Sequence, residues 1–142
     1  MEISIFTGKQ PEFLCTAAIR QAVFVEEQGF HNEFDELDET STHCLITVDH
    51  LPVATSRAYE KEKGHWIIGR VAVMPQYRHQ QLGKAAVEAI CSYCVDQGAT
   101  LLELSAQIQA EGFYTRLGFT STGQTHMDEF CPHVTMIRKT GE

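Results

Sequence analysis

The chain has 142 residues, 43% of them hydrophobic, and a formal net charge of −8 from 19 acidic and 11 basic side chains. That length and composition predict one globular domain spanning 1–142 and exclude a disordered tail. The excess of acid argues against a basic nucleic-acid-binding face, and no apolar run reaches the length of a membrane span. We therefore expect a cytoplasmic protein with neither nucleic acid nor membrane as a partner.

The first half of the chain has the apolar patterns of a strand, a helix and a hairpin. Pro11 stands at a plausible first helical position, and Asp49 and His50 suit a tight turn between two strands. In chain order, the pattern predicts a strand at 1–6, a helix at 11–27, an acidic loop or short helix at 33–39, and strands at 43–48 and 52–59.

The second half repeats strand and helix more regularly. The pattern predicts a strand at 65–74, a helix from 82 that ends at Gly98, a strand at 100–106, a short helix at 108–117, and strands at 119–125 and 133–139. A strand, helix and strand between 66 and 106 imply a parallel pair with a right-handed crossover. The fold class is therefore α/β or α+β, with one mixed sheet.

Acid is concentrated in one segment. Seven Asp and Glu residues lie between 26 and 40, where there is no Lys or Arg. Such a segment either attracts a cationic partner or is a solvated acidic loop. The five cysteines are scattered, and Cys91 and Cys94 fall deep in a helical pattern, so we expect structural thiols. No His spacing predicts a metal site, and none is expected.

The segment between the strand at 65–74 and the following helix is a candidate phosphate loop. Its sequence, RHQQLGK (78–84), opens a helix, where unpaired backbone N–H groups and the positive helix end favour an anion. Arg78 and Lys84 add positive charge, and Gly83 permits a close approach to the backbone. The loop has neither GxxxxGK[ST] nor GxGxxG, so an ordinary connection is the alternative.

Two blocks of sequence resemble the GNAT superfamily of acetyl-CoA-dependent N-acetyltransferases. They are the strand and loop IIGRVAVMPQYRHQQLG (67–83) and the segment AQIQAEGFYTRLGF (106–119). RQAVFVEEQ (20–28), DELD (35–38), THCLI (42–46) and PHVTM (132–136) are similar to the small ElaA/YjcF-type subgroup. The chain departs from the family pattern at Gln81, where a loop glycine is usual, and at Gln107, where Asn is frequent.

The resemblance implies the GNAT fold, with a mixed six- to seven-stranded sheet, about four flanking helices and a splayed parallel strand pair. It also implies acetyl-CoA as co-substrate, with its pantetheine arm along a strand edge and its pyrophosphate on the loop, and no metal. The residues implied for this role are Val71, Ala72, Val73, Arg78, His79, Gln80, Gln81, Leu82, Gly83, Lys84, Gln107 and Tyr114.

Direct transfer of an acetyl group to an amine needs a base, an oxyanion donor and an acid. By the resemblance, Tyr114 is the acid that donates to the leaving sulfur, with a core tyrosine as the alternative. Glu27 and His133 are the candidate bases, and the Val71 N–H is the candidate oxyanion donor. We expect the acceptor to contact residues drawn from Arg20, Phe24, Glu27, Asp38, His43, Arg70 and His133.

The function that follows is N-acetylation of a primary amine of a small molecule, such as an amino sugar, a polyamine or an amino-acid derivative. The acidic segment would attract a cationic acceptor, or it would be a lid held by Arg20 and Arg70. A non-catalytic acyl-CoA-binding module is one alternative, and an acyl-homoserine-lactone synthase is another. A homodimer is the oligomeric state that we expect.

Overall fold

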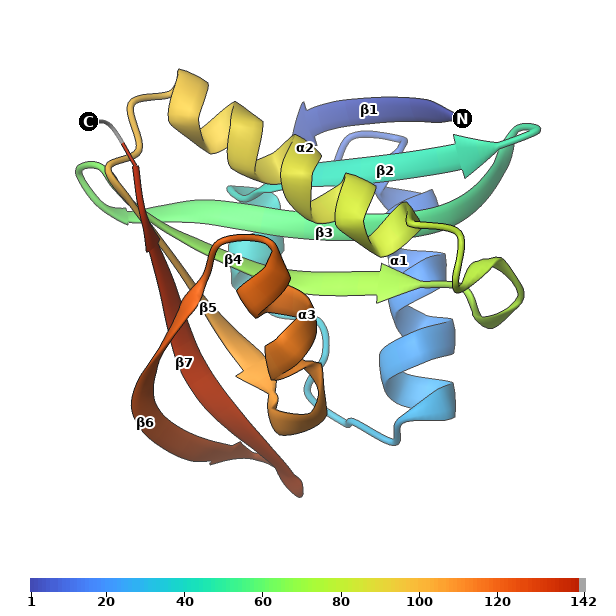
Figure 1. Ribbon diagram of the computed structural model, residues 1–142. Coiled ribbons are helices and arrows are strands. Elements are labelled where there is room, and N and C mark those ends of the chain that lie inside the picture. The colour runs from blue at the N-terminus through green and yellow to red at the C-terminus, as the bar shows by residue number, and fades with distance from the viewer. Residues whose placement is uncertain (141–142) are drawn as a thin grey trace.

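The computed structural model describes residues 1–140, which form one seven-stranded sheet in the order β1-β2-β3-β4-β5-β7-β6 (Figure 1). The strands are β1 (Glu2–Thr7), β2 (Thr42–Val48), β3 (Leu51–Glu62), β4 (His65–Val73), β5 (Leu101–Gln107), β6 (Thr120–Asp128) and β7 (Cys131–Lys139). The α-helices are α1 (Phe13–Arg20), which continues as a π-helical segment over Gln21–Glu27, α2 (Leu82–Asp96) and α3 (Glu111–Arg116). Short 3₁₀ turns cover Glu36–Glu39, Pro75–Tyr77 and Ile108–Ala110.

The predicted fold class and element order are confirmed. The number of helices is three rather than about four, because the acidic segment forms only the single turn Glu36–Glu39. Asp35 caps that turn through a capping box with Asp38, and four residues are too few for a further α-helix. The turn between β2 and β3 lies at Asp49 and His50, as predicted, and both have positive φ angles, 51° and 67°.

Among the strands within residues 1–140, only β4 and β5 pair in parallel, as the strand–helix–strand pattern predicted. Their register runs from His65 opposite Leu101 to Ile68 opposite Leu104 and then stops. Figure 1 shows the two strands diverging toward their arrowheads, with α3 lying near the opening. The sheet is therefore split along its middle beyond Ile68, as the family resemblance implied.

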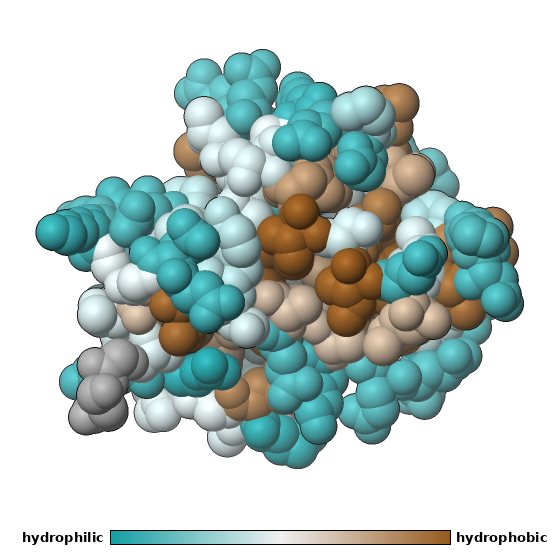
Figure 2. All heavy atoms as spheres, turned by 90° about the horizontal axis from the view of Figure 1, so that it is seen from above, coloured by the Kyte–Doolittle hydropathy of each residue, from teal (hydrophilic) through white to brown (hydrophobic). Residues whose placement is uncertain are grey.

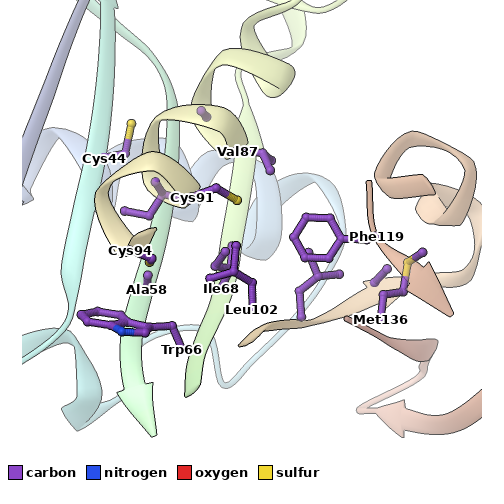
Figure 3. Packing of buried hydrophobic residues seen from close by; sticks show 14 of the residues in the cluster. Cys44, Ala58, Trp66, Ile68, Val87, Cys91, Cys94, Leu102, Phe119 and Met136 are labelled. Atoms are coloured by element: carbon purple, nitrogen blue, oxygen red, sulfur yellow. The ribbon is translucent and has the colours of Figure 1, made fainter. Parts of the chain in front are cut away.

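The two faces of the sheet carry separate cores. Helix α2 covers one face, where Val87, Cys91 and Cys94 lie above Ile68 and Leu102 (Figure 3). Helix α1 covers the other face, and its buried residues pack with Phe6 of β1 and Leu45 of β2. No helix within residues 1–140 is long and apolar enough to cross a membrane.

The cysteines behave as structural thiols. All five are free, and Cys44, Cys91 and Cys94 are buried. Burial raises the pKa of Cys44 to about 11, that of Cys91 to about 11 and that of Cys94 to about 12. At neutral pH these three are therefore uncharged and poorly nucleophilic.

Candidate active site

A bulge in β4 frees one edge of that strand. Arg57 pairs with Gly69 and Thr55 with Ala72, so two residues of β4, Arg70 and Val71, lie opposite one residue of β3. Arg70 has a φ of 52°, the left-handed backbone typical of a bulge.

Beyond the bulge, the side of β4 that faces β5 has no strand partner. The N–H of Met74 bonds to Val53 in β3, so alternation along the strand directs the N–H groups of Val73 and Val71 to the open side. These groups are free to pair with an extended ligand, as an added strand would.

The loop before α2 also presents free backbone N–H groups. His79 and Gln81 both have left-handed backbones, with φ angles of 64° and 66°. None of the backbone N–H groups from His79 to Lys84 donates a hydrogen bond within residues 1–140. Alternating left-handed residues and a helix N-terminus together form a concave anion site, the arrangement predicted from the sequence.

The free edge of β4 and this loop form two sides of a cleft of about 950 Å³, which we call the basic cleft. Arg78, Lys84 and Arg116 line it, and no Asp or Glu among residues 1–140 does, although the whole chain has a net charge of −8. Of the twelve residues expected to bind CoA, ten line this cleft: Val71, Ala72, Val73, Arg78, His79, Gln81, Leu82, Gly83, Lys84 and Tyr114. Gln80 is exposed and lines neither this cleft nor the second cavity, and Gln107 lines the second cavity instead.

That second cavity, which we call the central cavity, has a volume of about 350 Å³ and lies between the diverging β4 and β5. Val71 and Tyr114 line both hollows, so the two meet at the free edge of β4. Gln28 also lines both, and its side-chain oxygen accepts a hydrogen bond from Gln107 at 2.9 Å. A ligand in the basic cleft and a second ligand in the central cavity would therefore meet beside Val71 and Tyr114.

Tyr114 lies in α3 at this junction, with its ring edge-on to Phe113 at 4.9 Å between centroids. Its hydroxyl makes no hydrogen bond with any residue of the described chain. Burial raises the pKa of Tyr114, so the phenol stays protonated across the physiological range and can act only as a donor toward an anion.

The two candidate bases have different surroundings. His133 is 7% exposed and lines the central cavity, and its Nδ1 lies 3.0 Å from the carbonyl oxygen of Cys131. A carbonyl only accepts hydrogen bonds, so Nδ1 is the donor and Nε2 is the ring nitrogen left to exchange a proton. Glu27 lines neither hollow and binds Arg78 through both oxygens, at 2.6 and 2.7 Å. Arg78 lowers the pKa of Glu27, which makes it the weaker base.

The acidic segment is held by three arginines. Arg20 is fully buried and bonds to Glu33 at 2.9 Å and Asp38 at 2.8 Å. Arg57 bonds to Asp38 at 3.0 Å and to Asp35 at 2.7 Å. Arg70 adds ion pairs to Glu33 and Asp35. Together these ion pairs fix the segment as one wall of the central cavity. The segment was expected either to attract a cationic acceptor or to be a lid held by Arg20 and Arg70, and these contacts agree with a segment held by arginines.

The remaining residues expected to bind the acceptor divide into two groups. Phe24 and Arg70 line the central cavity with His133. Arg20, Asp38 and His43 line neither hollow; they are buried behind the wall, with His43 Nε2 3.0 Å from the carbonyl oxygen of Asp38. The structure therefore places these three in support of the wall.

Sequence reasoning missed several residues of the site. Arg57 is a charge inside an apolar strand, the same signal that singled out Arg70, and that signal could have found it. Arg116 and Gln28 lie within segments that resemble the family, but nothing in those segments singled out either residue. Glu129 was also missed: at the β6–β7 turn, it accepts hydrogen bonds from the backbone N–H groups of His31 and Asn32, at 2.8 and 2.9 Å. This contact ties the β6–β7 turn to the segment between α1 and β2.

Comparison with known proteins identifies the family. The sequence model of the acetyltransferase (GNAT) family matches residues 12–119. The chain is 35% identical over 127 residues to the uncharacterized protein YyaT of Bacillus subtilis, covering 85% of this chain and 84% of YyaT. It is 29% identical over 123 residues to the uncharacterized N-acetyltransferase YjcF of the same organism, covering 84% and 87% of the two chains.

Solved structures agree with this assignment at the level of the fold. Escherichia coli ElaA superposes with a TM-score of 0.87 at 24% identity, covering 97% of this chain and 99% of ElaA. The acyl-homoserine lactone synthase BjaI superposes with a TM-score of 0.81 at 17% identity, and the match covers 82% of that longer chain. The resemblance to the ElaA/YjcF-type subgroup is confirmed, and the chain is an acyltransferase that belongs to the GNAT acetyltransferase family.

Proposed function

We propose that this acyltransferase uses acetyl-CoA and transfers the acetyl group directly to the primary amine of a small molecule. The observation that supports this most is the basic cleft, in which three basic side chains, and no acidic one from the described part of the chain, surround unpaired backbone N–H groups in an otherwise acidic protein. A ligand with a pyrophosphate fits those groups. The acceptor is an amino sugar, a polyamine or an amino-acid derivative.

In this proposal, the backbone N–H groups of the loop from His79 to Lys84 bind the pyrophosphate. Gln80 therefore binds the pyrophosphate through its backbone N–H and not through its side chain. The pantetheine arm pairs with the free edge of β4, where the N–H groups of Val71 and Val73 point to the open side. This arrangement delivers the thioester to the junction with the central cavity.

The chemistry uses three groups at that junction. Nε2 of His133 takes a proton from the acceptor ammonium, directly or through water, and the neutral amine forms a C–N bond to the thioester carbonyl. The N–H of Val71 stabilises the oxyanion that results. As the C–S bond breaks, the Tyr114 hydroxyl donates a hydrogen bond to the leaving thiolate, which then takes a proton from solvent, and the second amine proton and the proton on His133 pass to solvent. The products are the N-acetylated amine and CoA.

The first experiment compares thermal melting of the protein with acetyl-CoA, CoA and ATP. A ligand at 100 times its dissociation constant adds about 2.7 kcal/mol, which is a rise of several degrees for a domain of this size. We expect a rise with acetyl-CoA and CoA but not with ATP. The absence of a rise at millimolar acetyl-CoA would refute the cofactor assignment.

A matched pair of variants tests the role of Tyr114. Tyr114→Phe should leave the acetyl-CoA melting shift unchanged and lower the rate of thiol release by about 10²-fold, as expected for the loss of one hydrogen-bond donor to a developing anion. Tyr93→Phe is the control, because Tyr93 lies on α2 against Trp66 and lines neither hollow. Equal rates for the two variants would remove Tyr114 from the mechanism.

We also propose that the protein is a homodimer joined through β1. This strand is an edge of the sheet, pairs regularly along its whole length with β2, and contains no Lys, Pro or bulge that would block a further strand. Ile3 and Ile5 are exposed on it, and Figure 2, which looks onto this side of the molecule, shows apolar surface ringed by hydrophilic residues. Ile3→Lys should convert a dimer to a monomer in light scattering, and a wild-type monomer would refute the proposal.

A further inference from the structure

The wall of the central cavity formed by the acidic segment presents positive charge. Glu33, Asp35 and Asp38 face three arginines, but only Glu33 among these acids lines the cavity, whereas both Arg57 and Arg70 do. Asp35 and Asp38 lie behind the guanidinium groups. An acceptor in the cavity therefore meets two cations and one carboxylate on this wall.

Arg70 keeps one of its nitrogens free. Its Nε lies 2.9 Å from an oxygen of Glu33, and its Nη2 lies 3.2 Å from an oxygen of Asp35. Its Nη1 makes no hydrogen bond within residues 1–140, and the side chain is 24% exposed. Arg57 differs, because both of its terminal nitrogens are directed to Asp35 and Asp38 and its side chain is only 6% exposed. Arg70 is thus the guanidinium available to a ligand.

The backbone at Arg70 is left-handed, a conformation that glycine adopts freely and an arginine adopts at a cost. Residues held in such conformations cluster at ligand sites, where the surrounding structure fixes them. Here the bulge fixes the residue, and the salt bridges to Glu33 and Asp35 hold the guanidinium rigid. A rigid planar donor with one free nitrogen is well suited to an oxygen of a carboxylate.

We propose that the acceptor amine also carries a carboxylate, and that Nη1 of Arg70 binds it; this inference rests on the proposed function. Asp128 and His133, from β6 and β7 beyond β5 in the sheet, also line the cavity and are groups that can receive an ammonium. Phe24 and Phe30 supply apolar surface, and a volume of about 350 Å³ suits a ligand of amino-acid size. The acceptor class is therefore an amino acid or a close derivative, rather than a polyamine.

The test measures binding to the protein–CoA complex by calorimetry, so it does not depend on turnover. The probes are L-phenylalanine, L-leucine and L-methionine, each paired with its own amide. The amide has the lower amine pKa and so more of the reactive neutral amine, yet it lacks the carboxylate. We expect at least one acid to bind about tenfold more tightly than its amide, as one charge-assisted hydrogen bond implies. Amides that bind as well as every acid would overturn the proposal.

Two variants separate recognition from a structural role. Arg70→Gln should abolish the preference for the acid over its amide. Asp35→Asn should retain or increase it, because Asn still caps the Glu36–Glu39 turn and one competing carboxylate is lost from Arg70. An acid preference that survives in Arg70→Gln would also overturn the proposal. Thiol release from acetyl-CoA is measured separately: its absence with acids that do bind would refute the transfer activity and leave the assignment of Arg70 standing.

Discussion

Two neighbouring glutamines in the loop before α2 should respond in opposite ways to the same substitution. Gln81 has a φ of 66° and a ψ of 15°, and Gln80 has an ordinary negative φ. A left-handed backbone costs a residue with a Cβ about 1–2 kcal/mol, and glycine loses about 0.4–1 kcal/mol through the entropy of the unfolded chain. Gln81→Gly should therefore stabilise the protein by about 0.5–1 kcal/mol.

Gln80→Gly is the matched control. Both side chains are exposed, so neither substitution removes a packed group, and Gln80→Gly should destabilise by about 0.4–1 kcal/mol. The gap between the variants is then about 1–2 kcal/mol, which is about 3–6 °C in melting temperature for a domain of this size.

Urea unfolding and thermal melting measure this gap, with and without acetyl-CoA. Because we attribute pyrophosphate binding to backbone N–H groups, Gln81→Gly should keep the melting shift given by acetyl-CoA. Equal melting temperatures for the two variants would refute the strain argument. A lost acetyl-CoA shift in Gln81→Gly would show that the Gln81 side chain, and not the backbone, holds the ligand.

Three further predictions follow from the charged contacts. Arg20→Met should lower the free energy of unfolding by about 3 kcal/mol in urea, because Glu33 and Asp38 each lose a buried partner and keep only one, Arg70 and Arg57 respectively. Burial alone would raise the pKa of Asp38, but Arg20 and Arg57 outweigh it and hold that pKa below its ordinary value. The resulting stability is present above about pH 4 and lost as pH falls through the folded pKa, so Asp38→Asn should flatten the acid limb of a stability profile. Glu129→Ala should speed hydrogen exchange at the amides of His31 and Asn32, which donate to that carboxylate; unchanged exchange would show that the contact does not order the segment.

The elements of this fold were predictable because each has a local signal. The helix over 82–96 has apolar residues at regular spacing and ends before Gly98, and the Asp49–His50 turn has residues that tolerate positive φ angles. The acidic segment was ambiguous for a physical reason. A run of acids gives no apolar stripe, so its conformation depends on the arginines that meet it from other elements.

The candidate site was only partly predictable. The loop and the strand before it are contiguous in sequence, and ten of the twelve residues expected there line the basic cleft. The central cavity instead combines side chains from β3, β4, β5, β6, β7, α3 and the segment after α1, so no local pattern marks it. Arg20 was grouped with the acceptor because a charge in an apolar context signals function and buried pairing equally well, and Asp38 because it lies in the acidic segment.

Arg70 connects the two halves of the site. Its left-handed backbone makes the bulge that turns β4 away from β5, and this leaves the N–H groups of Val71 and Val73 free. Its side chain, fixed by Glu33 and Asp35, lines the cavity that opens between the same two strands. A glycine at this position would keep the bulge at lower backbone cost but would remove the guanidinium. The geometry that opens the basic cleft is therefore separable from the charge that faces the acceptor, which is why Arg70→Gly should keep the acetyl-CoA melting shift while losing the preference for a carboxylate.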